Sequence, residues 1–345
     1  MDFLHYYAKK IDKNISEKID VRDLFHYGDR IYTPWNTEPG FLSYKYCPSL
    51  WTLGARTNNN AEESNALIEE ILTCANMVFD FVNEPDQKEK RIQFADKNKD
   101  KLYLKAYCEL ITYLRQLFSC YNEMISDDQL SDFVKDTEWG WVRFFKSIKD
   151  FEKITIITYN YDIWLERILK ALGVSFGVSG FDDCSDKLIE VIKPHVSISF
   201  VTDAISKGYG VKYALDFEGL QINELRVQYT DLTQYDKSFI IPPAGDSMRL
   251  ERCSPWSYSL REKAKNAALS IRDDDEIVLC GISYWHVDRR ELDSLLISLN
   301  EDSHFTFINP APSRDLNAVL TSVFKNYILQ SSSTEIGVIV NGKAV

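Results

Sequence analysis

Small and polar residues follow four hydrophobic runs in the second half of the chain, and their side chains suit the binding of phosphate and ribose groups. Histidine titrates near neutral pH, so it can serve as a general base. Serine donates hydrogen bonds to phosphate or ribose oxygens, and glycine lets a backbone approach a ligand closely. The four segments are Thr158-Tyr159-Asn160-Tyr161-Asp162, Lys193-Pro194-His195-Val196-Ser197, Gly281-Ile282-Ser283 and Asn309-Pro310.

The hydrophobic runs that precede these segments are short and rich in β-branched residues, which is typical of buried strands. Helix-like runs alternate with them, and this alternation predicts an α/β fold with a doubly wound, mainly parallel, Rossmann-like sheet. In such sheets ligands bind outside the carboxyl ends of the strands, so we expect the four segments to converge on one ligand. The predicted strands are 154–157, 188–192, 239–241, 276–280 and 304–308, and the predicted helices are 163–172, 257–272, 289–299 and 316–324.

Each segment also has a purely structural interpretation. Asn160 and Asp162 are suited to capping the helix predicted from residue 163. A lone histidine such as His195, placed beside a strand, is more often structural than catalytic. Gly-x-Ser turns are common, and Asn309-Pro310 is an ordinary turn sequence. Both interpretations stay open, and the shared position of the segments after predicted strands favours a site.

The first part of the chain has a different pattern. Residues 61–150 carry apolar side chains at helical spacing, so we expect a helical insertion there within a single domain over residues 1–345. Residues 50–57 are predicted to form a short strand that enters a turn at Gly54. The Asn341-Gly342 pair favours a tail or hairpin over residues 331–345.

Composition limits the partners and the compartment. The net charge of -12 disfavours direct nucleic-acid binding, which needs an excess of Lys and Arg. The seven cysteines include no Cys-x-x-Cys pair, so we expect no zinc and a reducing compartment. No apolar run reaches the roughly 18 to 20 residues of a membrane helix, and the N-terminus lacks a signal sequence. These features predict a cytoplasmic protein that does not enter a membrane.

The ordered set of segments resembles the SIR2-like (sirtuin) family over residues 150–325. Residues 158–162 are similar to the Thr-Gln-Asn-Ile-Asp element of sirtuins, and residues 193–197 to the Lys-Leu-His-Gly-Ser form of the bacterial SIR2-like branch. The family also carries a strand followed by Gly-Thr/Tyr-Ser and a late strand that ends in Ile-Asn. Residues 281–283 and 308–309 match these two elements.

Three departures separate the chain from the zinc-containing protein deacylases. The family's Gly-Ala-Gly-x-Ser loop is missing, and its nearest counterpart is Gly54-Ala55-Arg56-Thr57. His195 is followed by Val196 rather than glycine, and the paired Cys-x-x-Cys zinc module is absent from the sequence. With the long helical block at 61–150, the chain looks more like the bacterial anti-phage effectors of this family, which cleave NAD.

The resemblance implies a role for each matched residue. Asn160 would hold a water molecule or the ribose hydroxyls, Asp162 would bind the nicotinamide carboxamide, and His195 would act as a general base. Gly281 and Ser283 would meet phosphate or ribose, and Asn309 would contact the adenosine side. The full set of NAD-binding candidates beyond the three catalytic ones is Gly54, Ala55, Thr57, Thr158, Gly281, Ser283 and Asn309.

The resemblance therefore implies an NAD glycohydrolase that takes NAD as substrate and needs no other cofactor. Such an enzyme depletes a shared metabolite, so it has to stay inactive until it is triggered. We expect a trigger-sensing protein partner, a homo-oligomer, or both. One alternative is a catalytically degenerate SIR2-like subunit that binds a nucleotide or a partner. Another is an unrelated doubly wound protein whose motifs match by coincidence.

Overall fold

The chain forms two compact units in a computed structural model. Helices α9 (Trp164–Ala171) and α10 (Pro255–Leu269) each contain a boundary between the units. Unit 1 comprises residues 1–126, 159–164 and 193–259, and unit 2 comprises 127–158, 165–192 and 260–345. The structure describes residues 2–10, 44, 47–55, 61–83, 101–202, 222–234, 240, 255–282, 284, 289–333 and 336.

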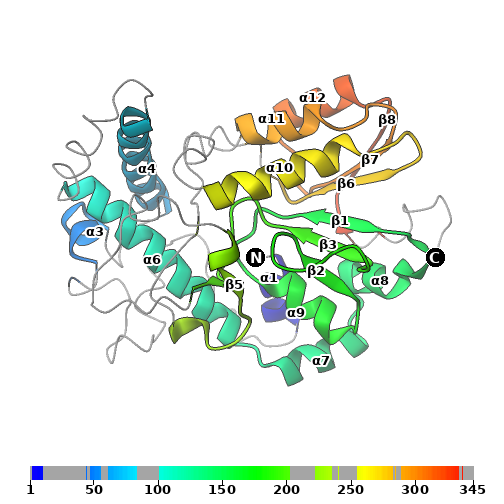
Figure 1. Ribbon diagram of the computed structural model, residues 1–345, viewed down its shortest axis with the longest axis horizontal. Coiled ribbons are helices and arrows are strands. Elements are labelled where there is room, and N and C mark those ends of the chain that lie inside the picture. Colours follow the sequence, from blue (N-terminus) through cyan, green and yellow to red (C-terminus); the bar gives the residue numbers. More distant parts are fainter. Residues whose placement is uncertain are drawn as a thin grey trace. The chain divides into compact units, whose positions relative to one another are not determined.

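Unit 2 is built on two parallel three-stranded sheets (Figure 1). The first has the order β1-β3-β2 and the second the order β6-β7-β8, so the α/β class with parallel sheets is confirmed. The strands are β1 (Ile154–Ile157), β2 (Phe176–Val178), β3 (Ile189–Ile192), β6 (Glu276–Cys280), β7 (His304–Ile308) and β8 (Asn326–Gln330).

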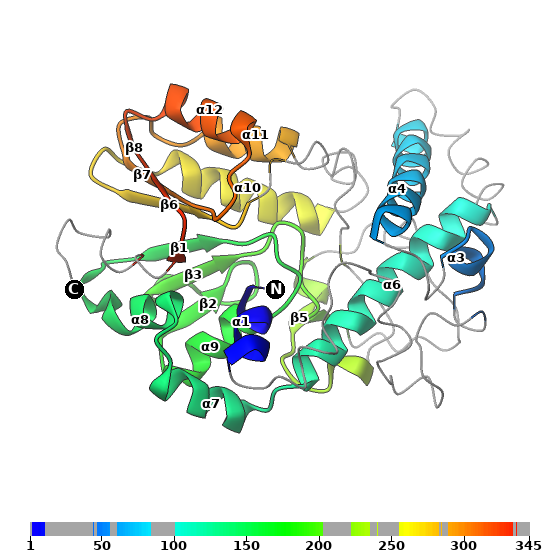
Figure 2. The ribbon, with the colours of Figure 1, turned by 180° about the vertical axis from the view of Figure 1, so that it is seen from behind.

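Helices cover the sheets and separate these strands along the chain, except that a loop joins β2 to β3. In Figures 1 and 2, α8 and α9 lie along the first sheet, and α11 and α12 lie along the second. None of the helices within the described ranges is both long enough and apolar enough to cross a membrane. The remaining helical elements of unit 2 are α7 (Asp127–Asp136), α8 (Gly140–Ser147), η3 (Ile148–Asp150), α11 (Arg289–Ile297) and α12 (Arg314–Val323).

Alternation along strand β6 connects the two cores of unit 2. Ile277 and Leu279 pack into a cluster with apolar residues of β7, α11 and α12. Val278 and Cys280 point to the opposite face and join a second cluster, which contains residues of β1, β3, α8 and α9. Because successive strand residues face opposite sides, one strand contributes to both cores. The second cluster therefore links the two sheets.

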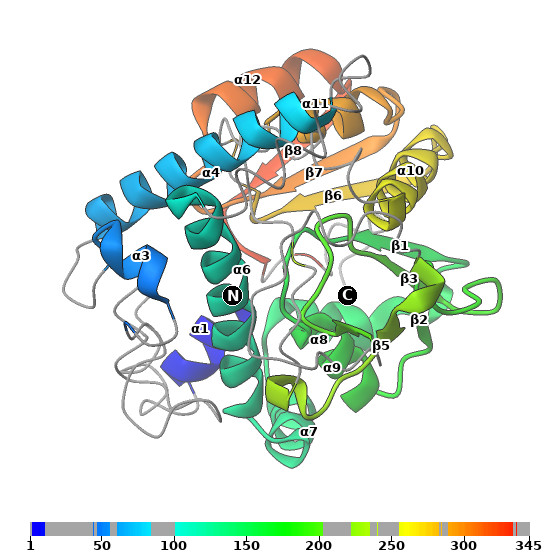
Figure 3. The ribbon, with the colours of Figure 1, turned by 60° about the vertical axis from the view of Figure 1, so that its left-hand side comes forward.

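Unit 1 is organised around the long helix α6 (Leu102–Glu123), most of whose side chains are buried. Helix α4 (Ala61–Asn83) and the short helix α3 (Pro48–Thr52) both pack against α6 (Figure 3). The described part of the predicted block 61–150 consists of helices joined by short non-helical segments, and these helices belong to both units. The other elements of unit 1 are α1 (Asp2–Lys10), β4 (Phe200–Val201), η5 (Ile222–Glu224), β5 (Arg226–Val227) and η6 (Leu232–Gln234), with β4 and β5 antiparallel.

The predicted strand over residues 50–57 is wrong, because its first residues belong to helix α3. Pro48 starts this helix, a position where its fixed φ is favourable. Gly54 ends it with a φ of 97°, and the N–H groups of Gly54 and Ala55 donate back to the carbonyl oxygens of Trp51 and Leu50. This is a Schellman cap, and a short apolar run alone does not distinguish such a helix from a strand.

Four of the five predicted strands and all four predicted helices agree with the structure to within a few residues, and other elements were missed. The runs at 154–157, 276–280 and 304–308 form strands with the predicted bounds. Strands β2 and β8 and helix α7 were not predicted. The predicted strand 239–241 lies outside the described residues except for Ile240, and so does most of the predicted tail hairpin at 331–345.

Gly173 follows the end of α9 and has a φ of 70°, a left-handed conformation that glycine adopts without strain. The N–H groups of Gly173 and Val174 donate to the carbonyl oxygens of Lys170 and Leu169, as in a Schellman cap. We expect Gly173→Ala to lower the free energy of unfolding by about 1 kcal/mol, because left-handed backbone is unfavourable for alanine. Gly173→Asn should cost less, since asparagine tolerates this conformation. Urea unfolding measures both, and equal losses would contradict the assignment.

Candidate functional site

The candidate site begins where two hydrogen-bonded parallel strands end side by side. Strands β1 and β3 pair in register, with Ile157 opposite Ile192. The N–H of Thr158 continues the ladder by donating to the carbonyl oxygen of Ile192 at 2.9 Å. The segments that follow, here called the Asn160 turn (residues 158–162) and the His195 loop (residues 193–199), therefore start at the same edge of the sheet.

Hydrogen bonds join the Asn160 turn to the His195 loop. The carbonyl oxygen of Tyr161 accepts from the N–H of Ile198 at 2.9 Å and from Oγ of Ser197 at 3.2 Å. The rings of Tyr159 and His195 also meet edge to face, with centroids 4.8 Å apart. The structure thus brings together the segments that carry all three predicted catalytic residues.

The three predicted catalytic residues differ in exposure. Asn160 is exposed, whereas Asp162 is 9% exposed and His195 only 2%. An exposed amide can meet a ligand directly. A general base has to come within hydrogen-bond distance of its substrate, so His195 would need its surroundings to open before it could act.

Asp162 has a clear structural task at the start of α9. Its Oδ1 accepts a hydrogen bond from the N–H of Trp164 at 3.3 Å, as expected of a residue that begins a helix. Burial by itself would raise the pKa of Asp162, but the nearby Lys193 ammonium and the Trp164 N–H favour the carboxylate and help to lower that pKa. The helix-start interpretation of Asp162 is confirmed, and its contact with a nicotinamide stays a prediction.

Val196 occupies an unusual backbone conformation directly after His195. Its φ is 72° and its side chain is fully buried. A β-branched residue rarely adopts this left-handed region, which glycine adopts without strain. The resemblance to the SIR2-like family predicts glycine at this position, and glycine would adopt this φ without strain.

A second pair of predicted residues lies at the carboxyl ends of β6 and β7 in unit 2. The N–H of Gly281 donates to the carbonyl oxygen of Ile308 at 3.2 Å, and Gly281 has a φ of 65°. Asn309 uses Nδ2 to donate to the carbonyl oxygen of Ile282 at 3.1 Å and Oδ1 to accept from the N–H of Ala311 at 2.9 Å. Asn309 therefore acts as a turn former that ties these strand ends together.

The remaining predicted contacts are described only in part. Gly54 and Ala55 form the end of α3, where Gly54 supplies the left-handed residue of the cap and Ala55 is buried. A helix cap accounts for this glycine without a phosphate. Ser283 and Thr57 lie outside the described residues.

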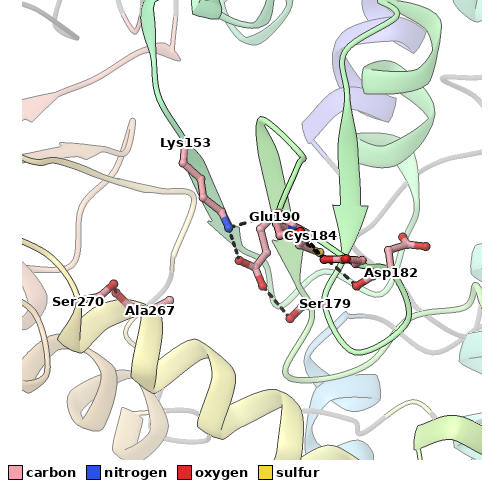
Figure 4. Close-up of polar contacts among 9 residues, drawn as sticks. Lys153, Ser179, Asp182, Cys184, Glu190, Ala267 and Ser270 are labelled. Atoms are coloured by element: carbon pink, nitrogen blue, oxygen red, sulfur yellow. Dashed lines mark hydrogen bonds and ion pairs between the residues drawn. The ribbon is translucent and has the colours of Figure 1, made fainter.

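A polar network in unit 2 closes the loop between β2 and β3 (Figure 4). Glu190 is held by Lys153, whose Nζ is 3.3 Å from Oε2, and by Oγ of Ser179 at 2.9 Å from Oε1. Asp182 accepts from the N–H of Val178 at 2.8 Å. Burial, with Glu190 and Asp182 nearby, raises the pKa of Cys184. Its thiol is thus kept protonated, and the network has the character of a structural support.

The chain was also compared with known proteins. No protein-family model matches it, and no curated protein sequence matches it. Within the part of the chain that the structure describes, no three His, Cys, Asp or Glu side chains are grouped so that they could hold a metal ion.

Replacing Val196 by glycine should destabilise the protein less than replacing it by alanine, by about 1 kcal/mol. Only glycine adopts a φ of 72° without strain. Val191, which is equally buried in strand β3, is the matched control. There the order should reverse, because glycine weakens a strand interior. Urea unfolding of the four variants tests this, and the same order at both positions would overturn the assignment.

Asp162 should make the stability of the protein sensitive to acid. Its folded pKa lies below the ordinary value of 3.8, so the carboxylate stabilises the fold above that pH and the contribution is lost as the pH falls through the folded pKa. We expect the urea midpoint of the wild type to fall more steeply below about pH 4 than that of Asp162→Asn. Asp136→Asn, at an exposed position, is the control. Parallel curves for the wild type and Asp162→Asn would contradict this role.

Proposed function

We propose that the protein is a SIR2-like NAD glycohydrolase of the bacterial anti-phage type, which acts by depleting NAD. The observation that carries the proposal is the junction of the Asn160 turn with the His195 loop at the ends of neighbouring parallel strands. The resembled family uses the same two elements, in the same order, around the nicotinamide ribose. The left-handed backbone at Val196 adds support, because this conformation favours glycine, the residue that the family carries after its histidine.

The reaction breaks the bond between the nicotinamide nitrogen and the anomeric carbon of the ribose. Nicotinamide leaves with the electron pair of that bond, and a water oxygen adds to the anomeric carbon. In the proposal Asn160 orients this water or the ribose hydroxyls, and His195 accepts a proton from one of them. Asp162, fixed by its bond to Trp164, is the candidate partner of the nicotinamide carboxamide.

The proposal also takes the sheets β1-β3-β2 and β6-β7-β8 as the halves of one doubly wound, Rossmann-like arrangement. The shared apolar cluster, with residues of β1, β3, β6 and β7, supports this interpretation. It assigns Thr158, Gly281, Ser283 and Asn309 to the rest of the nucleotide, and Gly54, Ala55 and Thr57 to the diphosphate. Substitution of the residues in each of these two groups, followed by measurement of NAD binding, tests the assignments separately from catalysis.

The low exposure of His195 fits an enzyme that is inactive until it is triggered. A base that is covered in the resting protein cannot reach NAD, which protects the cell's NAD supply. The proposal therefore includes a trigger-sensing protein partner, self-assembly, or both, as the event that opens the site, in a cytoplasmic setting. It requires neither zinc nor a second cofactor.

Incubation of the full-length protein with NAD should yield nicotinamide and ADP-ribose, measured by chromatography. The assay is run on the protein alone, in concentrated assemblies and with the products of neighbouring genes. Asn160→Ala and His195→Asn should each lower kcat by roughly 10²- to 10⁴-fold, because each removes a group that positions or deprotonates the nucleophile. Asparagine is chosen at position 195 because it keeps most of the buried volume.

His304→Ala and Asn266→Ala are the matched controls, since both residues are exposed and lie outside the proposed site. They should leave turnover unchanged. The absence of turnover in every assembly state would refute the enzyme. If NAD nevertheless binds to the wild type and to His195→Asn without product, the catalytically degenerate nucleotide-binding subunit becomes the better account.

A further inference from the structure

Two positively charged side chains are among the largest fully buried side chains of unit 1. Arg115 of α6 and Lys193 at the end of β3 are each only 1% exposed. Burial of a guanidinium or an ammonium is rare, because the charged group loses its hydration unless the protein replaces it. Carbonyl oxygens of the Asn160 turn and the His195 loop are among the hydrogen-bond acceptors of these two cations.

Lys193 connects the two segments directly. Its Nζ donates to the carbonyl oxygen of Asp162 at 2.6 Å, which reaches from the first residue of the loop to the last residue of the turn. The carbonyl oxygen of Lys193 in turn accepts from the N–H of Val196 at 2.9 Å and closes the bend that contains His195. One buried residue thus fixes the start of the loop and the end of the turn.

Arg115 holds the other end of the loop. Its Nη1 donates to the carbonyl oxygen of Ile198 at 3.0 Å, and its Nη2 to that of Leu232 in η6 at 3.5 Å. The planar guanidinium presents these donors in a rigid fork, so a single side chain can span two carbonyl groups. Ile198 also donates its N–H to Tyr161, so the restraint extends from α6 through the loop to the turn.

Helix α6 is itself fixed on both sides of Arg115. The carboxylate of Glu109 accepts hydrogen bonds from the N–H groups of Ser49 and Leu50, at 2.9 and 2.8 Å, and so ties α6 to α3. Toward the end of the helix, Glu123 accepts from Oγ1 of Thr233 at 3.0 Å. The fork of Arg115 is therefore anchored on a helix with little freedom to shift.

We propose that Arg115 and Lys193 are positioning residues that clamp the His195 loop against the Asn160 turn and fix Asn160 and His195 relative to each other, both before and after the site opens. The proposal rests on the proposed function for its catalytic part, while the clamp itself is a property of the fold. It gives the helical block a part in the site, since α6 supplies one of the two cations. Neither cation needs to touch the substrate.

The first test replaces Arg115 by lysine, which keeps the buried charge but cannot span both carbonyl groups. Amide hydrogen exchange of residues 195–199, followed by mass spectrometry, should become at least about tenfold faster. In the NAD assay kcat should fall roughly 10²-fold while KM changes little, because a misplaced group slows reaction more than binding. The double variant Lys193→Met/Asp162→Asn removes the buried ammonium and the buried carboxylate near it together, so that neither charge is left alone. It should speed amide exchange in residues 158–162 as well.

Leu110→Ala is the matched control, because Leu110 is fully buried in the same helix. It should lower the melting temperature without speeding exchange in residues 195–199 and without changing kcat. Unchanged exchange in both clamp variants would overturn the proposal, as would equal exchange in the clamp variants and the control. If the wild type never cleaves NAD, the proposed function fails, and the exchange experiment still decides whether the clamp exists.

Discussion

The parallel pairing of β1 with β3 is the constraint on which the candidate site depends. The pairing fixes where both strands end, and Thr158 extends it by one further hydrogen bond to Ile192. A shift of one residue in this register would turn every side chain of the strand to the opposite face. Because Ile189 and Val191 of β3 are buried in the core that links both sheets and Ile154 and Ile156 of β1 pack against it, such a shift would expose apolar side chains. The core thus determines which residues begin the Asn160 turn and the His195 loop.

Beyond the ends of β1 and β3, where the backbone hydrogen bonds between the two strands stop, buried polar groups hold the following segments together. The loop from 193 to 199 is entirely buried, so its backbone groups cannot rely on water and need partners within the protein. Arg115 donates to the carbonyl oxygen of Ile198 within the loop, and Lys193 donates from the loop to that of Asp162 in the turn. Removing one partner of such a buried arrangement typically costs several kcal/mol. The arrangement is therefore a rigid support, and rigidity of this kind is what a catalytic geometry requires.

Four strands, β1, β3, β6 and β7, could be predicted because their short runs are rich in β-branched and other apolar residues and alternate with helix-like runs. Helix α3 could not, because its five residues are too few to show a helical period and its identity depends on the cap at Gly54. The buried partners of the loop were also beyond prediction. Arg115 lies on α6, 83 positions before its acceptor at Ile198, and nothing local marks such a pair. Lys193 offered the one usable signal, a cation placed directly after a hydrophobic strand.

A matched residue supports the functional interpretation only to the extent that the fold does not already explain why that residue type stands there. Asp162 begins α9, Asn309 ties two strand ends, and Gly54 ends α3, so unrelated proteins with the same local geometry would select the same residue types. His195 occupies a fully buried loop, which is joined to the turn by hydrogen bonds from Lys193, Ser197 and Ile198 and by the contact between the rings of His195 and Tyr159. A histidine in that place, one residue before a left-handed backbone, is not demanded by strand or helix geometry. The functional interpretation therefore rests on His195 and the exposed Asn160 far more than on the number of motifs matched.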